Sequence, residues 1–325
     1  MKLTAKPVTL PLEHPFSITG YTFLNLEAVW VTLENDGYRG QGEGVGVYYL
    51  GDNQQSMLEE IQEAKAQVES GKDPFEVAVT LESKGAANAL DCAAWDLRCK
   101  LEGKTIWELL GLEPKNLNTV ATVGIGTDEF MAQRASDFSR YRNLKIKLDA
   151  ERPIERVRAI REARPDASLV IDANQAWSLE LLAELLPALT ELGVKMVEQP
   201  LKRGEDAGIE TLDSQIPIGV DEGCLNLSEY RAVGQSYDVV NIKLDKCGGL
   251  TPALEIADAA RADGKRLMVG NMTGTSLSMA PAFVIGQYCE FVDIDGPLLL
   301  KSDIEGGLKY LPGGEVEPPE RSLWG

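Results

Sequence analysis

From Val120 onward, short runs rich in β-branched residues alternate with stretches whose apolar residues recur every three to four positions. The first pattern is typical of strands and the second of amphipathic helices. Strands joined by such helices run parallel, because a parallel connection needs a crossover of about a dozen residues or more. We therefore predict an α/β fold in which eight successive strands close into a barrel. The expected strands are VATVGI, LKIKLD, SLVIDAN, KMVEQP, IPIGVDE, DVVNIKLDK, RLMVGN and EFVDIDG, and the expected helices are PIERVRAIREAR, LELLAELLPALTELG, LSEYRAVGQS and TPALEIADAARADG.

The preceding part of the chain follows other patterns. Residues 1 to about 50 alternate like antiparallel strands, and Asn35 to Gly37 supply a turn between two β-rich runs. From Asn53 to about Leu110 the period becomes helical, and the stretch AANALDCAAWDLRC is rich in small residues. We expect a compact α+β unit in which this second helix is tightly packed.

Composition excludes several classes of function. Lys and Arg number 32 against 51 Asp and Glu, and a net charge of −19 repels nucleic-acid phosphates and anionic membranes. No apolar run is long enough to span a bilayer and the first residues lack a signal-peptide pattern, so we expect a cytoplasmic protein. The five cysteines form no CxxC pattern and His14 is the only histidine, which excludes zinc sites and Ser-His-Asp triads.

Five polar side chains lie at the ends of successive expected strands. In LKIKLD the lysines alternate with Leu144, Ile146 and Leu148, so the lysines and the apolar residues face opposite sides of the strand. Because all parallel strands of a barrel end on the same face, we expect the five side chains to converge at one mouth. They are Lys147, Asp172, Glu198, Asp221 and Lys243, each about one strand–helix unit from the next.

Three of these residues are carboxylates, Asp172, Glu198 and Asp221. Carboxylates this close repel one another unless a cation neutralises them, and hard oxygen ligands without Cys or His suit Mg²⁺, with Mn²⁺ as the other choice. The alternative for each residue alone is an ordinary helix N-cap, especially near Asn174 and Ser178.

The lysines approach the expected metal site from opposite sides. If a substrate carboxylate binds the metal, one of Lys147 and Lys243 would remove the α-proton and the other would deliver a proton to the opposite face. Such a lysine must be partly neutral near pH 7, and Lys145 supplies a like charge to Lys147 and a hydrogen bond to the substrate carboxylate. The plain alternative is solvated lysines on an exposed strand. Lys246 is expected to face elsewhere.

The order of motifs resembles one known family. The segments KIK, IDAN, VEQP, GVDE and NIKLDKCGG, with LDCAAWDLRCKLEGKTIWELLG upstream, resemble the enolase superfamily in its muconate lactonizing enzyme subgroup. The resemblance covers nearly the whole chain. It implies a modified (β/α)₇β TIM-type barrel at 116–300, an N-terminal α+β capping domain at 1–115 with mobile specificity loops, and a C-terminal segment, 301–325, that returns to the cap. We also expect one Mg²⁺ per subunit and a homo-oligomer.

Members of that subgroup include muconate cycloisomerases, o-succinylbenzoate synthases, N-acylamino acid racemases and dipeptide epimerases. Asp293 and Asp295 in FVDIDGPLLL resemble the DxD motif by which dipeptide epimerases hold the substrate α-ammonium group. The resemblance therefore favours a dipeptide epimerase that inverts the α-carbon of the C-terminal residue. The alternatives are another activity of the subgroup, a pair of capping aspartates at a strand end, or a binding protein without catalysis.

Specificity departs from the best-known pattern. L-Ala-D/L-Glu epimerases of this family are expected to carry an arginine in the N-terminal loop, whereas PFSITGYTFLNLEAV has none and places Tyr21 at the matching position. A glutamate side chain would lose a charge-assisted hydrogen bond there, so we expect neutral or apolar dipeptides. The loop containing Tyr48, Tyr49 and Leu50 is either a lid over the substrate or a surface turn. Further substrate contacts are expected from Thr122, Asn271 and Met272, with Asn174 supporting the metal ligands.

Overall fold

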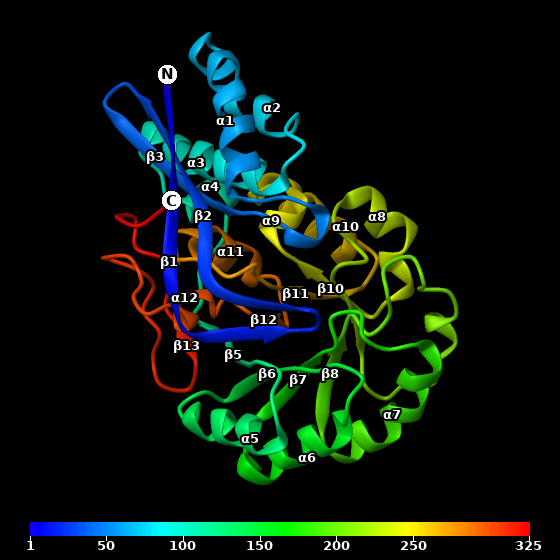
Figure 1. Cartoon of the computed structure of the whole chain (residues 1–325). Coiled ribbons are helices and arrows are strands. Elements are labelled where there is room, and N and C mark those ends of the chain that lie inside the picture. The colour runs from blue at the N-terminus through cyan, green and yellow to red at the C-terminus, as the bar shows by residue number, and fades with distance from the viewer.

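The computed structural model describes all residues, 1–325, and shows an antiparallel sheet with helices beside a larger barrel (Figure 1). The three strands of the N-terminal sheet are arranged in the order β1-β2-β3. Helices follow them in the chain, so the expected α+β unit is confirmed. Its elements are β1 (Lys2–Ile18), β2 (Tyr21–Asn35), β3 (Tyr38–Val45), the short turn η1 (Tyr48–Leu50), α1 (Gln54–Glu69), α2 (Pro74–Ala78), α3 (Lys84–Glu102) and α4 (Ile106–Leu110).

Helix α3 packs closely on strand β3, as its small residues predict. Along β3 every second residue is a glycine, and these glycines share the face that packs on α3: Gly40, Gly42 and Gly44. A Cβ at Gly42 would lie 2.2 Å from the carbonyl oxygen of Ala89, a distance that atoms cannot adopt. Glycine on the strand and alanine on the helix therefore allow the two backbones to approach.

The rest of the chain forms an eight-stranded parallel barrel, and all eight expected strands are present. No helix is both long and apolar enough to cross a membrane. The strands are β5 (Val120–Val123), β6 (Asn143–Lys147), β7 (Ser168–Asp172), β8 (Val194–Glu198), β9 (Ile218–Val220), β10 (Val239–Ile242), β11 (Arg266–Val269) and β12 (Phe291–Val292). The connecting elements include α5 (Asp128–Asp137), α6 (Pro153–Ala163), α7 (Leu179–Glu191), η2 (Ile209–Thr211), α8 (Leu227–Ala232), η3 (Gly234–Ser236), α9 (Leu244–Cys247), α10 (Leu250–Ala262), α11 (Ser276–Gly286) and α12 (Gly296–Leu299).

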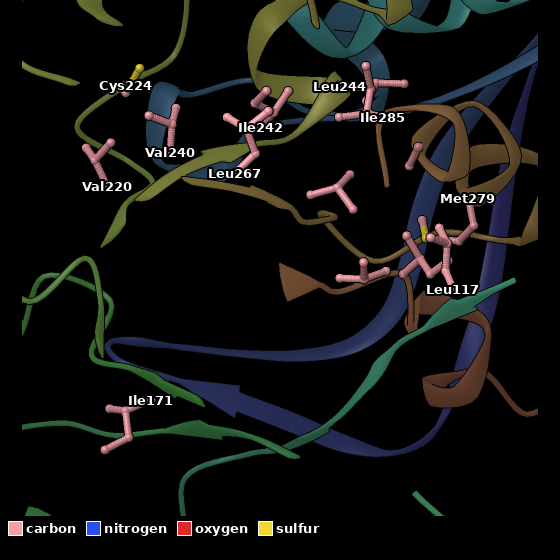
Figure 2. Close-up of a cluster of buried hydrophobic side chains, with 14 of the residues drawn as sticks. Leu117, Ile171, Val220, Cys224, Val240, Ile242, Leu244, Leu267, Met279 and Ile285 are labelled. Carbon is pink, nitrogen blue, oxygen red and sulfur yellow. The ribbon is translucent and has the colours of Figure 1, made fainter. Parts of the chain in front are cut away.

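Alternation along the barrel strands separates two sets of side chains. On β7, Leu169 and Ile171 belong to the large core between strands and helices, which Figure 2 shows with Ile171, Val220 and Val240. Val170, between them in sequence, belongs to a small cluster inside the barrel with Met196, Val239 and Met268. This cluster fills the interior, so that polar residues one step further along the inner face lie at the mouth.

Two barrel helices differ from the sequence prediction. Helices α5 and α11 form where the sequence analysis expects none. Every residue of α11 is buried, so the helix lacks the polar face that would mark it in the sequence. The segment NMTGTSLSMA is therefore a loop that continues into a helix at Ser276, where Thr275 caps the first turn.

The N-terminal unit contacts the barrel, and the chain terminus contacts the N-terminal unit. The turn of the β1–β2 hairpin reaches over the barrel end (Figure 1), where Thr19 Oγ1 donates to the carbonyls of Leu148 and Ala173 at 3.3 and 3.4 Å. At the terminus, Trp324 Nε1 donates to the Cys92 carbonyl of α3 at 3.0 Å. The last strand, β13 (Glu315–Val316), pairs with β4 (Leu117–Asn118).

A buried carboxylate joins the two parts of the molecule. Asp245, in α9 of the barrel, accepts hydrogen bonds from Val45 N at 2.9 Å and from Asn88 Nδ2 at 2.8 Å, both in the N-terminal unit. Burial raises the pKa of Asp245 to about 7, although these two hydrogen bonds act in the opposite direction. The folded state therefore favours the protonated carboxyl.

This shift predicts a pH-dependent stability. Because the pKa of Asp245 is raised on folding, its stabilising contribution is complete below about pH 4 and is lost as the pH rises to 7, at up to about 1.4 kcal/mol per pH unit. Asp245→Asn keeps the acceptor oxygen but does not titrate, so its unfolding free energy should fall less between pH 5 and 8. Urea unfolding at both pH values measures this. Asp36→Asn, at an exposed turn, is the control, and an equal slope in wild type and Asp245→Asn would contradict the prediction.

Candidate active site

Three carboxylates meet where the barrel strands end. Strands β6, β7 and β8 pair in a register that aligns Lys147 with Asp172 and Asp172 with Glu198, and Asp221 follows β9. One oxygen from each of the three carboxylates lies within 4.8 Å of the others, and each of these residues is at most 1% exposed. The three expected metal ligands are thus brought together in the buried mouth.

The lysines expected beside them contact the same carboxylates. Lys147 Nζ lies 2.6 Å from Asp172 Oδ2, and Lys243 Nζ lies 2.7 Å from Asp221 Oδ2. These two lysines come from β6 and from the end of β10, on either side of the three carboxylate-bearing strands. Both also line the cavity described below, so a molecule bound there has an amine on each side.

Lys145 joins the carboxylate cluster to a second acidic group. Its Nζ lies 2.8 Å from Glu198 Oε2, 3.1 Å from Asp172 Oδ2 and 2.9 Å from Asp293 Oδ2. Burial lowers the pKa of Lys145, but Asp293, Glu198 and Asp172 outweigh that effect and hold it well above its usual value. Lys145 is therefore a fixed positive charge next to Lys147.

Burial and ion pairs oppose each other in this cluster. Burial raises the pKa of Asp172, but Lys147 and Lys145 lower it to about 2. Burial and the neighbouring Asp172 raise the pKa of Glu198 to about 8. Burial lowers the pKa of Lys243, yet its acidic neighbours, Asp221 first, raise it by more. A divalent cation among the carboxylates would act in the opposite direction, so the lowered lysine pKa that is expected with the cation bound stays a prediction.

The donor set fits a hard divalent cation. The three carboxylates supply only oxygen, no histidine or cysteine lies among them, and their packing in a buried mouth is unfavourable without positive charge. Mg²⁺ or Mn²⁺ would be held by Asp172, Glu198 and Asp221, with remaining positions for water and substrate oxygens.

Three polar residues contact the expected metal ligands or their neighbours, and two of them, Asn241 and Lys246, are not predicted from the sequence. Lys246, expected to face elsewhere, contacts Asp221 and donates to its carbonyl at 2.6 Å, because the one-turn helix α9 directs it back into the barrel. Asn241 Nδ2 donates to Glu198 Oε1 at 2.7 Å. The Asn174 amide donates to Asp172 Oδ1 at 2.9 Å, which places Asn174 beside an expected metal ligand, and its Nδ2 donates to Glu222 Oε1 at 3.0 Å. Asn241 shares the inner face with Lys243, so strand alternation would have indicated it.

A cavity of about 540 Å³, including its open mouth, lies over these groups. Lys145, Lys147 and Lys243 line it, together with Asp293 and Asp295. Tyr48, Tyr49 and the N-terminal hairpin close it above, whereas Leu50 does not reach it. Among the residues expected to contact substrate, Thr122, Asn271 and Met272 line the cavity. Its apolar lining comprises Phe16, Ile18, Phe23, Tyr48, Tyr49, Met272 and Leu299.

Tyr21 does not line this cavity. Its side chain is 48% exposed and its ring stacks on that of Tyr48 at 5.1 Å. It borders a neighbouring groove between β2 and the turn η1. Tyr21 thus lies outside the cavity and its expected contact with the substrate stays a prediction, whereas Phe23, two residues further along the same strand, lines the cavity.

The acidic pair lies just past the short strand β12 instead of on it. Asn271 Nδ2 donates to Asp293 Oδ1 at 2.9 Å, and the Thr122 amide donates to Asp295 Oδ2 at 2.8 Å. Burial and the adjacent Asp293 raise the pKa of Asp295 to about 8, whereas the ammonium of Lys145 helps to keep the pKa of Asp293 below its usual value despite burial. Both residues line the cavity, and Asp293 is linked to the metal ligand Glu198 through the shared ammonium of Lys145.

Two curated relatives are similar over most of their length. The chain is 40% identical over 306 residues to the L-Ala-D/L-Glu epimerase of Escherichia coli, covering 93% of this chain and 95% of the relative. It is 38% identical over 250 residues to the N-acetyl-D-glutamate racemase of a Pseudoalteromonas species, covering 77% of this chain and 79% of that protein.

Solved structures agree with the fold. An enolase family member from Agrobacterium tumefaciens with homology to dipeptide epimerases, with bound sodium and L-Ala-L-Glu, matches with a TM-score of 0.95 at 34% identity, and the match covers 99% of each chain. The dipeptide epimerase of Enterococcus faecalis, complexed with Mg and L-Leu-L-Tyr, matches with a TM-score of 0.92 at 29% identity, covering 98% of this chain and 97% of the other.

Family models account for both parts of the molecule. The mandelate racemase/muconate lactonizing enzyme N-terminal domain matches residues 2–111, and the enolase C-terminal domain-like model matches residues 129–322. The chain is therefore a member of the mandelate racemase/muconate lactonizing enzyme family of the enolase superfamily.

Proposed function

We propose that this protein is a Mg²⁺-dependent dipeptide epimerase that inverts the α-carbon of the C-terminal residue. The observation that carries the proposal is a cavity lined by Lys147 and Lys243 next to three buried carboxylates, and lined as well by the acidic pair Asp293 and Asp295. Relatives with dipeptide epimerase activity support this assignment.

The lysines would carry out the proton transfers. One of Lys147 and Lys243 removes the α-proton from one face of the substrate, and the other returns a proton to the opposite face, which inverts the centre. A bound Mg²⁺ would supply the positive charge that stabilises the enediolate form of the substrate carboxylate. Lys145 lines the cavity as a permanent cation between Glu198 and Asp293, where it would pair with that carboxylate.

The charges around the cavity favour a zwitterionic substrate. In their ionised forms, six carboxylates and four ammonium groups leave two negative charges, which one divalent cation would neutralise. A dipeptide adds one carboxylate and one ammonium, and so leaves this balance unchanged, whereas a dicarboxylate would disturb it in an enclosed site. The groups are Asp172, Glu198, Asp221, Glu222, Asp293 and Asp295 with Lys145, Lys147, Lys243 and Lys246.

The roof of the cavity favours neutral side chains. Phe16, Ile18 and Phe23 project from the N-terminal hairpin, and no arginine lines the cavity. A glutamate side chain would thus be desolvated without a cationic partner, while an apolar side chain would gain from burial. A relative named as a hydrophobic dipeptide epimerase and the L-Leu-L-Tyr complex support this preference.

The second candidate is an N-acylamino acid racemase, because one relative is an N-acetyl-D-glutamate racemase. Such a substrate lacks the ammonium group that Asp293 and Asp295 would hold. A neutral acyl group would offer the acidic pair no positive charge beyond that of Lys145. The dipeptide is therefore the better fit to this cavity.

The metal site yields a binding prediction. Calorimetric titration should show one Mg²⁺ per chain, and Glu198→Gln should weaken binding at least about tenfold, because an amide replaces an anionic ligand in a buried site. Glu184→Gln, exposed on α7, is the matched control and should bind like wild type. Equal affinity in Glu198→Gln and wild type would contradict the assignment of the ligand.

The two-base assignment yields a kinetic prediction. Lys147→Ala and Lys243→Ala should each reduce epimerisation at least about a thousandfold, because each removes one proton-transfer group. Each variant should still exchange the α-proton of one enantiomer with solvent, since the remaining lysine serves one face. NMR in D₂O measures both rates. Lys195→Ala, exposed on β8, is the control, and wild-type epimerisation by either active-site variant would rule out the mechanism.

The substrate class is tested by mass spectrometry in D₂O. A library of L,L-dipeptides incubated with the protein and Mg²⁺ should gain one deuteron at the C-terminal α-carbon, with apolar residues labelled before acidic ones. Label in N-acylamino acids and in no dipeptide would move the function to the racemase. An absence of label in both sets would contradict proton-transfer chemistry at this site.

A further inference from the structure

The barrel is closed by side chains between its last and first strands. Strands β12 and β5 stand at the two ends of the strand order, and no backbone hydrogen bond joins them. Two side chains cross this seam instead. The Ile294 amide donates to Thr119 Oγ1 at 3.0 Å, and the Thr122 amide donates to Asp295 Oδ2 at 2.8 Å.

The seam lies against the segment Asp293–Asp295, which we call the acidic arm. The arm follows a strand of only two residues, so the sheet ladder fixes little of it. At its start, the Asp293 amide donates to the Val269 carbonyl at 2.9 Å, and Tyr310 Oη donates to the Ile294 carbonyl at 2.6 Å. From the β5 side, the Ile294 amide has a single partner, the hydroxyl of Thr119.

The hydroxyl of Thr119 is shielded from water. Thr119 and Ile294 are both completely buried, so water cannot replace the hydroxyl as acceptor for the Ile294 amide. Removing it would leave a buried donor unpaired in the middle of the arm. The arm would then shift or open to find another partner.

We propose that Thr119 is a positioning residue that holds the acidic arm in place and so sets the affinity for the substrate ammonium group. Thr119 does not line the cavity, and its side chain forms no hydrogen bond with the lysines or the metal ligands. Its effect passes through the Ile294 amide to the two carboxylates on either side of that residue. The inference rests on the proposed function, because it assigns the ammonium to Asp293 and Asp295.

Substitutions at this one position separate the hydroxyl from the volume. Thr119→Val keeps the shape and removes the acceptor, whereas Thr119→Ser keeps the acceptor. Thr119→Val should raise the KM for a dipeptide at least about tenfold, with kcat changed less than about threefold, because the arm binds the substrate but does not react. Thr119→Ser should stay close to wild type. Thr190→Val on α7, whose hydroxyl donates to Leu186 O at 2.8 Å away from the seam, is the control.

Hydrogen exchange of the substrate-free protein gives an independent readout. In Thr119→Val, peptides containing Ile294 and Thr122 should exchange at least about tenfold faster, while those from β7 and β8 should not change. If Thr119→Val does not fold, the comparison of Thr119→Ser with Thr119→Ala isolates the same hydroxyl.

Faster exchange at the seam together with a raised KM supports the proposal. Unchanged exchange, an unchanged KM, or equal effects in Thr119→Ser and Thr119→Val overturns it. If no dipeptide gains deuterium with the wild-type protein, the proposed function fails instead. The comparison of amide hydrogen exchange between the Thr119 variants and wild type then decides alone whether Thr119 holds the arm.

Discussion

The structure depends on a buried cluster of opposite charges at the end of the barrel. Asp172, Glu198 and Asp221 are almost fully buried, a position that isolated carboxylates cannot occupy at an acceptable free energy. Four lysines neutralise them in this arrangement, and two of those lysines would be released for chemistry if a divalent cation took over part of that role. Stability of the mouth and proton transfer on a substrate thus use the same residues.

Much of the fold could be predicted because parallel strands and crossover helices leave a strong periodic signal. Strand alternation also placed Lys145 and Lys147 on the inner face and Leu144 and Ile146 on the outer face. The signal failed for α11, which is buried on all sides, because tertiary contacts hold this helix and its own sequence pattern does not reveal it. Strand β12 was expected but is shorter than its sequence pattern suggests, so that Asp293 and Asp295 fall beyond it.

The candidate site was partly predictable for the same reason. Residues at strand ends converge by topology, so spacing alone brought the three carboxylates together. The prediction that Lys246 faces elsewhere was wrong, because the direction of its side chain depends on a one-turn helix that no sequence period indicates. Tyr21 lies outside the cavity because it stands at the tip of the β1–β2 hairpin, where its ring packs on those of Phe23 and Tyr48, and no sequence period indicates this packing. The contact of Thr119 with Ile294 could not be predicted from the sequence, because it forms only where the chain after β12 meets the start of β5.

A cation held by the three carboxylates would leave Lys147 and Lys243 facing a substrate α-carbon from opposite sides. A crystal structure of the protein with Mn²⁺ and a non-reactive dipeptide analogue tests this arrangement directly, because anomalous scattering locates the ion. We expect the ion to contact Asp172, Glu198 and Asp221, with the two lysine Nζ atoms on opposite sides of the α-carbon at about 3 to 3.5 Å. An ion bound elsewhere, or both lysines on one side of the α-carbon, would contradict the account.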